Sequence, residues 1–516
     1  MDNGIGRWNY KQAIMNPKRT ALVYGDREIT YTQLDSRTNQ IADAMSQRGV
    51  ERGDRVCILS TNSAEFLEAM FATAKLGAIF VPINFRLAGP EVAYVLGNAR
   101  PKLFLYSGNL SATVDTALKQ DDLPEFKVVA LETDDVPEGR EAFEDLVASG
   151  SPDKVERDVE RNDVAMIMYT SGTTGRPKGA MLTHNNIESN NINIMSMATG
   201  ISKYDTTVTP APLFHIGGLA VHTLPLLYLG GKVVILPTFV PADTLKQMQD
   251  HKATVQFMVP AMWAALTQVP DFDSYDTSQM RYGISGGAPC PIPVIEFFQN
   301  KGWEFTEGFG MTETCAGCTG LSMEDVVDRA GSVGQPALLV DLRIADEFGQ
   351  DLPRGEVGEL VVRGDNVFIG YWEMEDATRD AIRDGWFFTG DLGKLSEDGY
   401  LTLVDRKKDM IISGGENVYP IEVEQVLHRH PSVIDVAVIG VPHEKWGETV
   451  KAIVVAAPGQ TVSADEIIAF AKENLAGFKC PTSVETIDEL PRNATGKILK
   501  RTLREQYTGR GEAVTR

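Results

Sequence analysis

The 516-residue sequence has few cysteines, no excess of basic residues and no long uninterrupted apolar run. Five cysteines, an odd number, argue against a disulfide framework and indicate a reducing compartment. The net charge of -22 argues against a broad nucleic-acid-binding surface and a polybasic membrane anchor. Prolines, glycines and a lysine interrupt the most apolar stretch, 224–240, so it is too broken to span a bilayer as a helix. The first 16 residues lack the apolar core of a signal peptide. We therefore expect a cytoplasmic protein without a transmembrane segment.

The chain is too long for one compact core, and its hydrophobic pattern predicts a layered α/β fold. Within residues 28–130, short apolar runs such as 56–59 and 79–82 are typical of buried strands, and 64–76 has apolar residues at helical spacing. The same alternation recurs over 165–284. Strands that alternate with helices predict parallel sheet.

The pattern changes further along the chain. Residues 331–404 are rich in glycine and valine, which indicates short strands, tight turns and a β-rich subdomain. A boundary follows at 405–408. We therefore predict a large N-terminal domain, 1–404, and a small α+β C-terminal domain, 409–516, which is large enough to fold alone.

Inside the small domain the sequence predicts a helix over 421–429 and strands over 433–439 and 450–455. A second helix is expected to begin after Ser463 as its N-cap and to end at Gly477.

The strongest local signal is a polar loop directly after an apolar strand, residues 169–179, which read YTSGTTGRPKG. Glycines let a backbone wrap closely around a ligand, and N–H groups and hydroxyls suit phosphate oxygens. The loop is not a P-loop, because Lys178 is followed by glycine and not by serine or threonine.

Two other segments place one carboxylate among few other charges. Glu313 follows Thr312 in residues 307–314, EGFGMTET, and one carboxylate with substrate phosphates is the usual way in which proteins hold Mg²⁺. In the same segment, Phe309 is a candidate to offer a flat face to a base, with aromatic core packing as the commoner alternative for such a residue. Asp391 in residues 385–393, GWFFTGDLG, suits paired ribose hydroxyls.

Two remaining motifs point in different directions. Lys497 follows a Thr-Gly turn in residues 491–500, PRNATGKILK, and opens a helical stretch. Residues 283–287, GISGG, fit the nucleophile elbow of serine hydrolases. That elbow requires a helix immediately after the turn, and three prolines at 289, 291 and 293 argue against one.

Together, the segments around the polar loop, Glu313, Asp391 and Lys497 resemble the core motifs of the acyl-adenylate-forming (ANL) superfamily. That superfamily includes acyl-CoA synthetases, aryl-CoA ligases, firefly-type luciferases and the adenylation domains of peptide synthetases. The resemblance runs over essentially the whole chain, from residues 29–34, ITYTQL, to the C-terminal lysine. Residues 405–420, DRKKDMIISGGENVYP, look most like bacterial fatty-acyl-CoA and feruloyl-type ligases.

The resemblance implies ATP, Mg²⁺ and coenzyme A as ligands. The residues it implies for the β- and γ-phosphates of ATP are Thr170, Ser171, Gly172, Thr173, Thr174, Gly175 and Lys178. Those implied around adenine and next to it are Gly287, Ala288, Pro289, Phe309 and Gly310. Thr312 would contact the α-phosphate and Glu313 the Mg²⁺, and Asp391 and Arg406 would bind the ribose.

The same resemblance assigns roles to the small domain. Lys497 matches the lysine that bridges carboxylate and α-phosphate during adenylation, and Lys408 matches the hinge, 405–408, about which the small domain turns. The residues implied for the pantetheine arm of coenzyme A are Gly414, Gly415 and Trp446. Cys480 and Thr482 are uncharged where some relatives carry bases, so the resemblance gives no firm contacts for the nucleotide end of coenzyme A.

The acid substrate is a small-molecule carboxylic acid, and the residues implied for its pocket are His215, Gly218, Val259, Ser285 and Met311. Small and apolar neighbours with no evident buried cation favour a medium- or long-chain fatty acid, with a phenylpropenoid acid such as ferulate as the alternative. A peptide-synthetase module would need a carrier domain, and a luciferase-type oxygenase would form an oxygen-dependent product. Homodimers are common in the family, and the sequence leaves the oligomeric state open.

The placement of Lys497 near the C-terminus generates a prediction. We expect Lys497→Ala nearly to abolish acyl-AMP formation, because a cation must offset the approach of two anions. Thioester formation from pre-made acyl-AMP should stay largely intact, since that step needs other groups. Separate assays of the two half-reactions test this, and an equal loss of both would contradict it.

Overall fold

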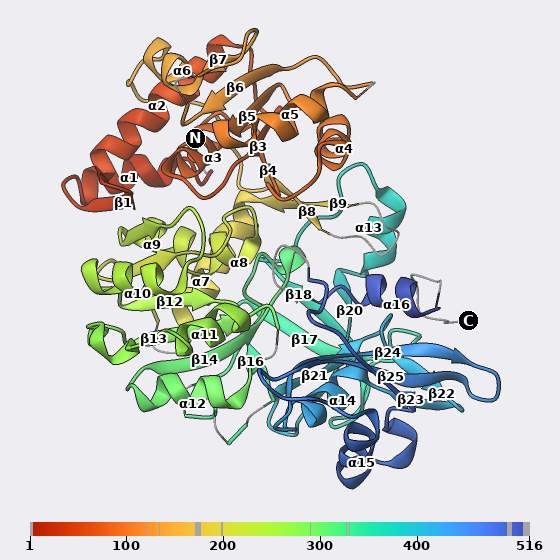
Figure 1. The fold of residues 1–516 in the computed structure, drawn as a ribbon. Coiled ribbons are helices and arrows are strands. Elements are labelled where there is room, and N and C mark those ends of the chain that lie inside the picture. Colours follow the sequence, from red (N-terminus) through yellow and green to blue (C-terminus); the bar gives the residue numbers. More distant parts are fainter. Residues whose placement is uncertain are drawn as a thin grey trace. The chain divides into compact units, whose positions relative to one another are not determined.

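The computed structural model describes residues 4–120, 122–133, 135–170, 177–197, 200–288, 290–322, 324–326, 328–329, 331–492 and 498–508. The chain forms two compact units, which are described separately (Figure 1). Unit 1 comprises Met1–Asp341 and Arg363–Phe387, and unit 2 comprises Leu342–Val362 and Phe388–Arg516. Within the described ranges, the helices are all too short or too polar to cross a membrane.

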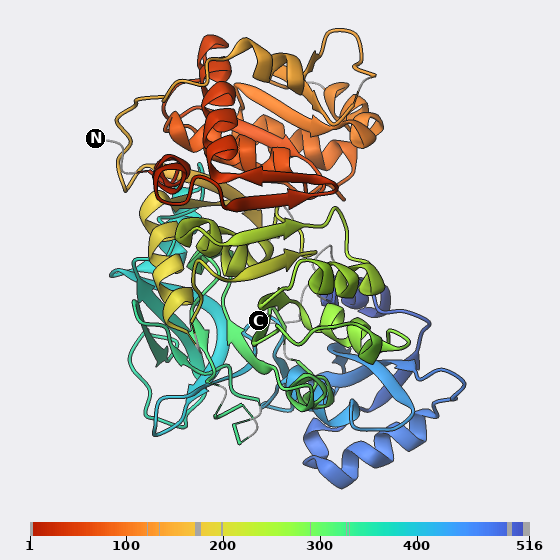
Figure 2. The same ribbon diagram turned by 90° about the vertical axis from the view of Figure 1, so that its left-hand side faces the viewer.

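The N-terminal part of unit 1 is a seven-stranded sheet with helices on both faces, drawn in red, orange and yellow (Figure 1, Figure 2). The strand order is β7-β6-β5-β3-β4-β8-β9, and all neighbours are parallel except β8 and β9. In this order the strands are β7 (Glu141–Ala142), β6 (Lys127–Leu131), β5 (Leu103–Ser107), β3 (Arg55–Leu59), β4 (Ile79–Ile83), β8 (Val164–Thr170) and β9 (Lys178–Thr183).

The alternation of side chains along β4 shows how the two faces are buried. Phe80 packs edge-on against Phe66 of α3 (Ala64–Lys75), with ring centroids 5.2 Å apart. Its neighbour Val81 points to the other face, where it shares a core with residues of α4 (Gly89–Ala99) and α5 (Ser111–Leu118). The predicted α/β class is therefore confirmed.

Two smaller sheets complete unit 1. A four-stranded sheet has the order β10 (Thr206–Thr209), β11 (Lys232–Ile235), β1 (Thr20–Tyr24) and β2 (Arg27–Thr30). A five-stranded sheet has the order β12 (Val255–Met258), β13 (Tyr282–Gly286), β14 (Glu304–Phe309), β15 (Thr319–Gly320) and β16 (Gln335–Pro336). The other helices and single turns are α1 (Arg7–Met15), α2 (Tyr31–Gln47), η1 (Gly108–Leu110), α6 (Phe143–Ser149), α7 (His184–Ser196), α8 (Ile216–Gly218), η2 (Leu219–Thr223), α9 (Leu224–Leu229), α10 (Pro241–Asp250), α11 (Pro260–Thr267), η3 (Phe272–Ser274), α12 (Ile292–Asn300), η4 (Thr312–Thr314) and α13 (Glu375–Ala381).

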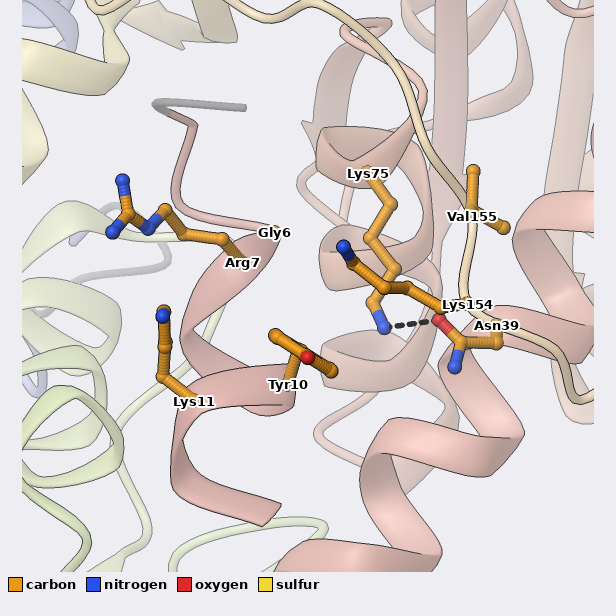
Figure 3. A pocket seen from close by; sticks show the side chains of 8 residues that line it. All are labelled: Gly6, Arg7, Tyr10, Lys11, Asn39, Lys75, Lys154 and Val155. Carbon is orange, nitrogen blue, oxygen red and sulfur yellow. Dashed lines mark hydrogen bonds between the residues drawn. The ribbon is translucent and has the colours of Figure 1, made fainter. Parts of the chain in front are cut away.

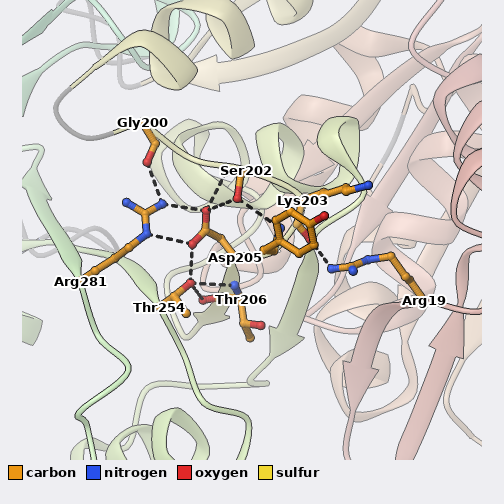
Figure 4. Close-up of polar contacts among 9 residues, drawn as sticks. Arg19, Gly200, Ser202, Lys203, Asp205, Thr206, Thr254 and Arg281 are labelled. Carbon is orange, nitrogen blue, oxygen red and sulfur yellow. Dashed lines mark hydrogen bonds and ion pairs between the residues drawn. The ribbon is translucent and has the colours of Figure 1, made fainter.

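A buried carboxylate ties together the starts of three strands (Figure 4). Asp205 directly precedes β10, Thr254 precedes β12 and Arg281 precedes β13. The Asp205 carboxylate accepts hydrogen bonds from Thr254 Oγ1 at 2.8 Å and from Arg281 Nε and Nη2 at 3.0 and 2.7 Å. Burial alone would raise the pKa of Asp205, but the bonds from Arg281 and Thr254 outweigh it and lower that pKa. The amino ends of these strands are thus fixed, which leaves their carboxyl ends for ligands.

Unit 2 contains two sheets. One has β17 (Val340–Ala345), β18 (Gly358–Gly364), β20 (Trp386–Leu395) and β21 (Leu401–Arg406), and β19 (Ile382–Arg383), which counts with unit 1, pairs with the first residues of β20. The other has β23 (Glu416–Val418), β22 (Ile411–Ser413), β25 (Gly447–Ala456), β24 (Val433–His443) and β26 (Ser483–Thr486). Its helices are α14 (Pro420–Leu427), α15 (Ala464–Asn474), η5 (Gly477–Lys479) and α16 (Lys500–Thr508). The predicted boundaries at 404 and 409 stay predictions, and the predicted hinge, 405–408, lies inside unit 2.

One predicted helix end in unit 2 is wrong. Ser463 is the N-cap residue of α15, but its side chain makes no capping hydrogen bond. The helix ends at Asn474 and not at Gly477, because Leu475 adopts an extended conformation with φ -133° and ψ 155°. Gly477 instead begins the short turn η5.

Glu307 on β14 holds the segment that follows the neighbouring strand β13. Ser285 of β13 lies opposite Glu307, and the Glu307 carboxylate accepts a hydrogen bond from the backbone N–H of Cys290 at 2.7 Å. Burial raises the pKa of Glu307 to about 7, and the bond from Cys290 offsets only part of that rise. A carboxyl whose pKa is higher in the folded state than in the unfolded one lowers stability as pH rises between the two values.

We therefore expect Glu307→Gln to become more stable relative to the wild type as pH rises from 5 to 8. Glutamine keeps an acceptor for Cys290 N–H but carries no charge, so the gain should reach about 2 kcal/mol at the upper end. Thermal unfolding of both proteins across this pH range measures the difference. Glu296→Gln, on α12 and exposed, is the control for removing one carboxylate. A pH-independent difference for Glu307→Gln would contradict the assignment.

Candidate active site

The predicted ATP-binding residues of unit 1 follow the carboxyl ends of its strands. Thr170 ends β8 and lies opposite Lys178, the first residue of β9. Gly287 and Ala288 follow β13, and Phe309 is the last residue of the parallel neighbour β14. Ligands of open α/β sheets bind beyond the carboxyl ends of the strands. An ATP site is therefore expected at the ends of these strands, which belong to two sheets.

Tyr371 links two of the predicted residues. Its hydroxyl donates a hydrogen bond to Glu313 Oε1 at 2.9 Å, and the Lys178 ammonium lies 5.0 Å from the centre of its ring. The buried carboxylate predicted for Mg²⁺ and the lysine predicted for phosphates are thereby brought to one aromatic side chain.

The sequence analysis missed Tyr371, although it lies in an aromatic pair with Trp372 directly after a glycine. Its segment adds to the edge of β9: Met181 N–H donates to the carbonyl of Gly370 at 2.9 Å, and Trp372 N–H donates to that of Gly179 at 2.7 Å. Phe368 N–H donates to the carbonyl of Glu313 at 2.8 Å. These contacts join residues that are far apart in the sequence, which no local pattern reveals.

The residues around Glu313 fit a metal that is shared with a substrate. Among the described residues, no group of three or more histidine, cysteine, aspartate or glutamate side chains forms a protein-only metal site. Mg²⁺ is commonly held by one or two carboxylates together with substrate phosphates. The buried Glu313, which Tyr371 links to the cation Lys178, fits that requirement.

Other predicted ATP residues differ in their exposure. Phe309 and Thr312 are partly exposed, and Ala288 is exposed. Gly310 allows a close approach of two backbone segments, because a Cβ there would lie 1.3 Å from the carbonyl oxygen of Ala316. Gly287 has φ +89°, which favours glycine. Seven further predicted residues lie outside the described residues: Ser171, Gly172, Thr173, Thr174, Gly175, Pro289 and Lys497.

The residues predicted for the acid lie on four segments of unit 1. His215 is the N-cap of α8, and its Nδ1 accepts from Gly217 N–H at 3.4 Å. Val259 lies near Gly287, since a Cβ at Gly287 would be 3.7 Å from its Cγ1. Met311 is partly exposed, and Ser285 is fully buried within β13.

Two glycines next to these residues have structural reasons of their own. A Cβ at Gly218 would lie 2.4 Å from the carbonyl oxygen of Pro212, so this position packs against backbone. A Cβ at Gly217 would lie 2.9 Å from the ring of Phe257, which also lies within 3.4 Å of the Cβ position at Gly286. The Phe257 ring therefore borders both the segment after His215 and the end of β13.

Two other residues of this region, Trp263 and Ser285, are fully buried. Trp263, four residues after Val259, lies in an aromatic core with Phe298 and Phe305, and its Nε1 donates to the carbonyl of Ile284 at 3.2 Å. Ser285 lies inside a strand, and residues 287–291 separate β13 from α12. This arrangement is not the sharp strand–turn–helix of a serine nucleophile elbow.

In unit 2, Asp391 and Arg406 lie opposite each other on β20 and β21 and form an ion pair of 2.5 Å. The structure thus brings together the two residues predicted for the ribose. Lys407 beside them pairs with Glu359 at 2.9 Å.

The predicted hinge residue Lys408 is exposed and lies between two anchored carboxylates. Asp405 accepts from the backbone N–H of Ile421, in the first turn of α14, at 3.0 Å. Asp409 accepts from Arg504 of α16 at 2.8 Å. Both anchors belong to the C-terminal part of unit 2.

The residues predicted for the pantetheine arm also lie together. Gly414 and Gly415 form the two-residue turn between β22 and β23, with φ +62° and +88°, a conformation that favours glycine. Gly414 N–H donates to the carbonyl of Trp446 at 2.9 Å, and a Cβ at Gly414 would lie 2.7 Å from the Trp446 ring. Trp446 is 45% exposed, and the Lys445 ammonium lies over its ring, 4.4 Å from the ring centre.

A separate cavity of about 310 Å³ lies among α1, α2, the end of α3 and residues 154–155 (Figure 3). Its lining includes the cations Arg7, Lys11, Lys75 and Lys154. Lys75 is buried and pairs with Asp35 at 2.6 Å, and Lys154 pairs with Glu156 at 3.0 Å. None of the residues predicted for ATP, the acid or coenzyme A lines this cavity, so it is not part of the site above.

Comparison with known proteins identifies the family. The family model of the AMP-binding enzymes matches residues 10–372, and the model of the AMP-binding enzyme C-terminal domain matches residues 422–497. A feruloyl-CoA synthase of Amycolatopsis sp is 40% identical over 98% of this chain and 99% of that protein. The long-chain-fatty-acid–CoA ligase FadD13 of Mycobacterium tuberculosis is 38% identical over 98% of each chain.

A solved structure of a further protein shows the same fold. The crystal structure of ATP-bound MatB from Rhodopseudomonas palustris superposes with a TM-score of 0.89 at 35% identity, over 98% of this chain and 99% of that chain. The chain therefore belongs to the AMP-binding enzyme family and, within it, to the ATP-dependent acyl-CoA synthetases.

Proposed function

We propose that this acyl-CoA synthetase activates a medium- or long-chain fatty acid. The acid would attack the α-phosphorus of ATP to give acyl-AMP and pyrophosphate, and the thiol of coenzyme A would then displace AMP to give the thioester. No protein nucleophile is required for either step. The observation that carries the proposal is the Lys178–Tyr371–Glu313 contact at the strand ends, which supports a site for a phosphate chain.

The residues of unit 1 have distinct proposed tasks in the first step. Glu313 would hold Mg²⁺ together with the phosphates, and bound Mg²⁺ would supply positive charge where negative charge develops. Lys178 would bind a terminal phosphate, and Tyr371 would orient the Glu313 carboxylate through its hydrogen bond. Thr312 is proposed to contact the α-phosphate.

Other proposed tasks fall on unit 2 and on Lys497. Asp391 would accept hydrogen bonds from the ribose hydroxyls, with Arg406 orienting its carboxylate through the ion pair. Lys497 would bridge the carboxylate of the acid and the α-phosphate. Gly414, Gly415 and Trp446 would contact the pantetheine arm of coenzyme A, and Lys408 would be the hinge between the two half-reactions.

The choice of acid rests on the chemistry of the predicted pocket. The five residues predicted to face it carry no charge: His215 counted neutral, Gly218, Val259, Ser285 and Met311. An uncharged wall favours an acid whose only charge is the reacting carboxylate. The two relatives named above act on different acids and differ by only two points of identity, 40% and 38%, so identity does not decide between them.

A phenylpropenoid acid is the second candidate, and one contact favours it. The ring of Phe257 borders the glycine positions 217 and 286, next to segments that are predicted to form the acid pocket. An aromatic ring at that place suits a planar aromatic acid. A cytoplasmic location remains proposed from the five free, buried cysteines, and a homodimer remains proposed from the family resemblance.

An acid panel decides between the candidates. The protein is incubated with ATP, Mg²⁺, coenzyme A and equal amounts of fatty, cinnamic and short-chain acids, and the thioesters are identified by mass spectrometry. We expect a graded series of fatty acyl-CoA products. A cinnamoyl-type thioester as the single product would replace the first candidate by the second, and accumulation of acyl-AMP alone would show that coenzyme A is the wrong acceptor.

A second experiment tests the contact that carries the proposal. Tyr371→Phe keeps the ring beneath Lys178 but removes the donor to Glu313. A hydrogen bond to a charged group contributes about 1.5–3 kcal/mol, so acyl-AMP formation should fall about 10- to 100-fold. The Mg²⁺ concentration for half-maximal rate should rise as well. An unchanged rate and Mg²⁺ dependence would remove Tyr371 from the site.

A further inference from the structure

One face of α7 carries buried asparagines that bind the backbone of other segments of unit 1. Asn186, Asn190 and Asn193 lie at i, i+4 and i+7, which places them on one side of the helix. Asn186 Nδ2 donates to the carbonyls of Asp365 and Val367 at 2.7 and 2.8 Å. Asn193 Oδ1 accepts from the N–H of Leu339 at 2.9 Å. All three side chains are buried, so the helix acts as a scaffold of amides.

The middle residue, Asn190, contacts two segments that matter for the reaction. Its Oδ1 accepts from the backbone N–H of Gly317 at 2.8 Å, and its Nδ2 donates to the carbonyl of Ala220 at 2.8 Å. Gly317 follows Thr312 and Glu313 by a few residues. Ala220 lies in the π-helical turn η2, which continues the segment that begins at His215. One side chain therefore spans the predicted acid segment and the turn that carries Glu313.

The turn that carries Glu313 is strained. Cys315 and Ala316 are consecutive non-glycine residues with φ +50° and +80°. A left-handed residue with a Cβ costs about 1–2 kcal/mol, and such a conformation persists only where the surroundings hold it. The turn η4, which contains Glu313, comes directly before this pair in the sequence. The left-handed residues therefore set the direction in which the chain leaves Glu313.

A second buried asparagine closes the turn from the other side. Asn366 Nδ2 donates to the carbonyl of Thr314 at 2.8 Å and to that of Gly317 at 2.9 Å. The two carbonyls, of Thr314 and Gly317, lie on either side of the left-handed pair in the sequence. Asn190 accepts from the N–H of Gly317, which follows the pair. These amides supply the hydrogen bonds that offset the strain of Cys315 and Ala316.

We infer that Asn190 and Asn366 are positioning residues: Asn366 fixes the strained turn that aims Glu313, and Asn190 keeps that turn in register with the acid-binding segment through Ala220. The inference rests on the proposed function for the identity of the two ligands. It assigns to α7 a task in aligning the acid with the metal-bearing end of ATP, on which the rate of an adenylation depends, because a misplacement of about 1 Å costs about 100-fold.

The test uses full-length protein and separates the two contacts. Asn366→Ala removes only the bonds to the turn, so kcat for acyl-AMP formation should fall about 10- to 100-fold and the Mg²⁺ concentration for half-maximal rate should rise at least threefold. The KM for the acid should stay within twofold. Asn190→Leu removes the contacts to Gly317 and to Ala220. It should therefore raise the KM for the acid about tenfold, in addition to the effects on kcat and Mg²⁺ dependence.

A matched control lies on the same helix. Asn191 is buried, and neither atom of its amide has a hydrogen-bond partner among the described residues. Asn191→Leu should therefore leave kcat, both KM values and the Mg²⁺ dependence within twofold of the wild type. This control shows that replacing a buried α7 asparagine does not by itself impair the reaction.

A rescue distinguishes positioning from a general loss of stability. Glycine adopts a positive φ without strain, so Ala316→Gly in the Asn366→Ala background should recover at least threefold of the lost rate. A cavity left by Asn366 would not be filled by that change. The inference is overturned if Asn366→Ala leaves rate and Mg²⁺ dependence unchanged, or if Ala316→Gly restores nothing. If the wild type forms no acyl-AMP, the proposed function fails. The variants are then compared by the Mg²⁺ dependence of their ATP binding, measured by calorimetry.

Discussion

The hydrogen bonds from buried amides to the backbone around Gly317 are the interactions on which the candidate site depends. The turn after Glu313 contains two left-handed residues that have side chains, and it lies in the protein interior, where unpaired backbone groups are costly. Asn190 and Asn366 satisfy those groups. Because the turn is held in this way, Glu313 can stay aimed without a cluster of other carboxylates around it.

The neighbouring contacts follow from the same constraint. Glu313 is fixed through its backbone by Phe368 and through its carboxylate by Tyr371, and Tyr371 in turn lies beneath Lys178. Few charges are needed at such a site because the substrate brings its own phosphates and the metal brings the positive charge. The strand starts are fixed at the opposite edge by the network around Asp205. Buried polar side chains therefore hold the starts of β10, β12 and β13 and, separately, the turn after β14.

The sequence predicted the parts of the fold that depend on local pattern. The α/β class follows from the alternation of apolar runs, and the strands near 56 and 79 lie where the apolar runs place them. Helix ends that depend on tertiary contacts were predicted less accurately. The helix α15 ends at Asn474, although Gly477 is the residue type that more commonly follows the end of a helix. The family resemblance is confirmed by full-length relatives.

In the candidate site, too, residues in local motifs could be predicted and residues that act through distant contacts could not. Thr312, Glu313 and Lys178 stand in motifs with a local signature, and their roles remain predictions that the geometry supports. Tyr371, Asn190 and Asn366 were missed because each contacts residues at least 30 positions away, across separate elements. An asparagine at i, i+4 and i+7 of a helix is a signal that was available in the sequence, but only its partners give it meaning.

The central claim is that the turn around Glu313 is organised before any ligand binds. Hydrogen exchange of the ligand-free wild-type protein, resolved at residues 310–317 by mass spectrometry, tests it most directly. We predict that the amides of residues 311 and 314–317 exchange slowly, at rates close to those of α7, because their N–H groups are bonded within the turn and to Asn190. Rapid exchange at the rates of exposed loops, with protection gained only when ATP and Mg²⁺ are added, would contradict it.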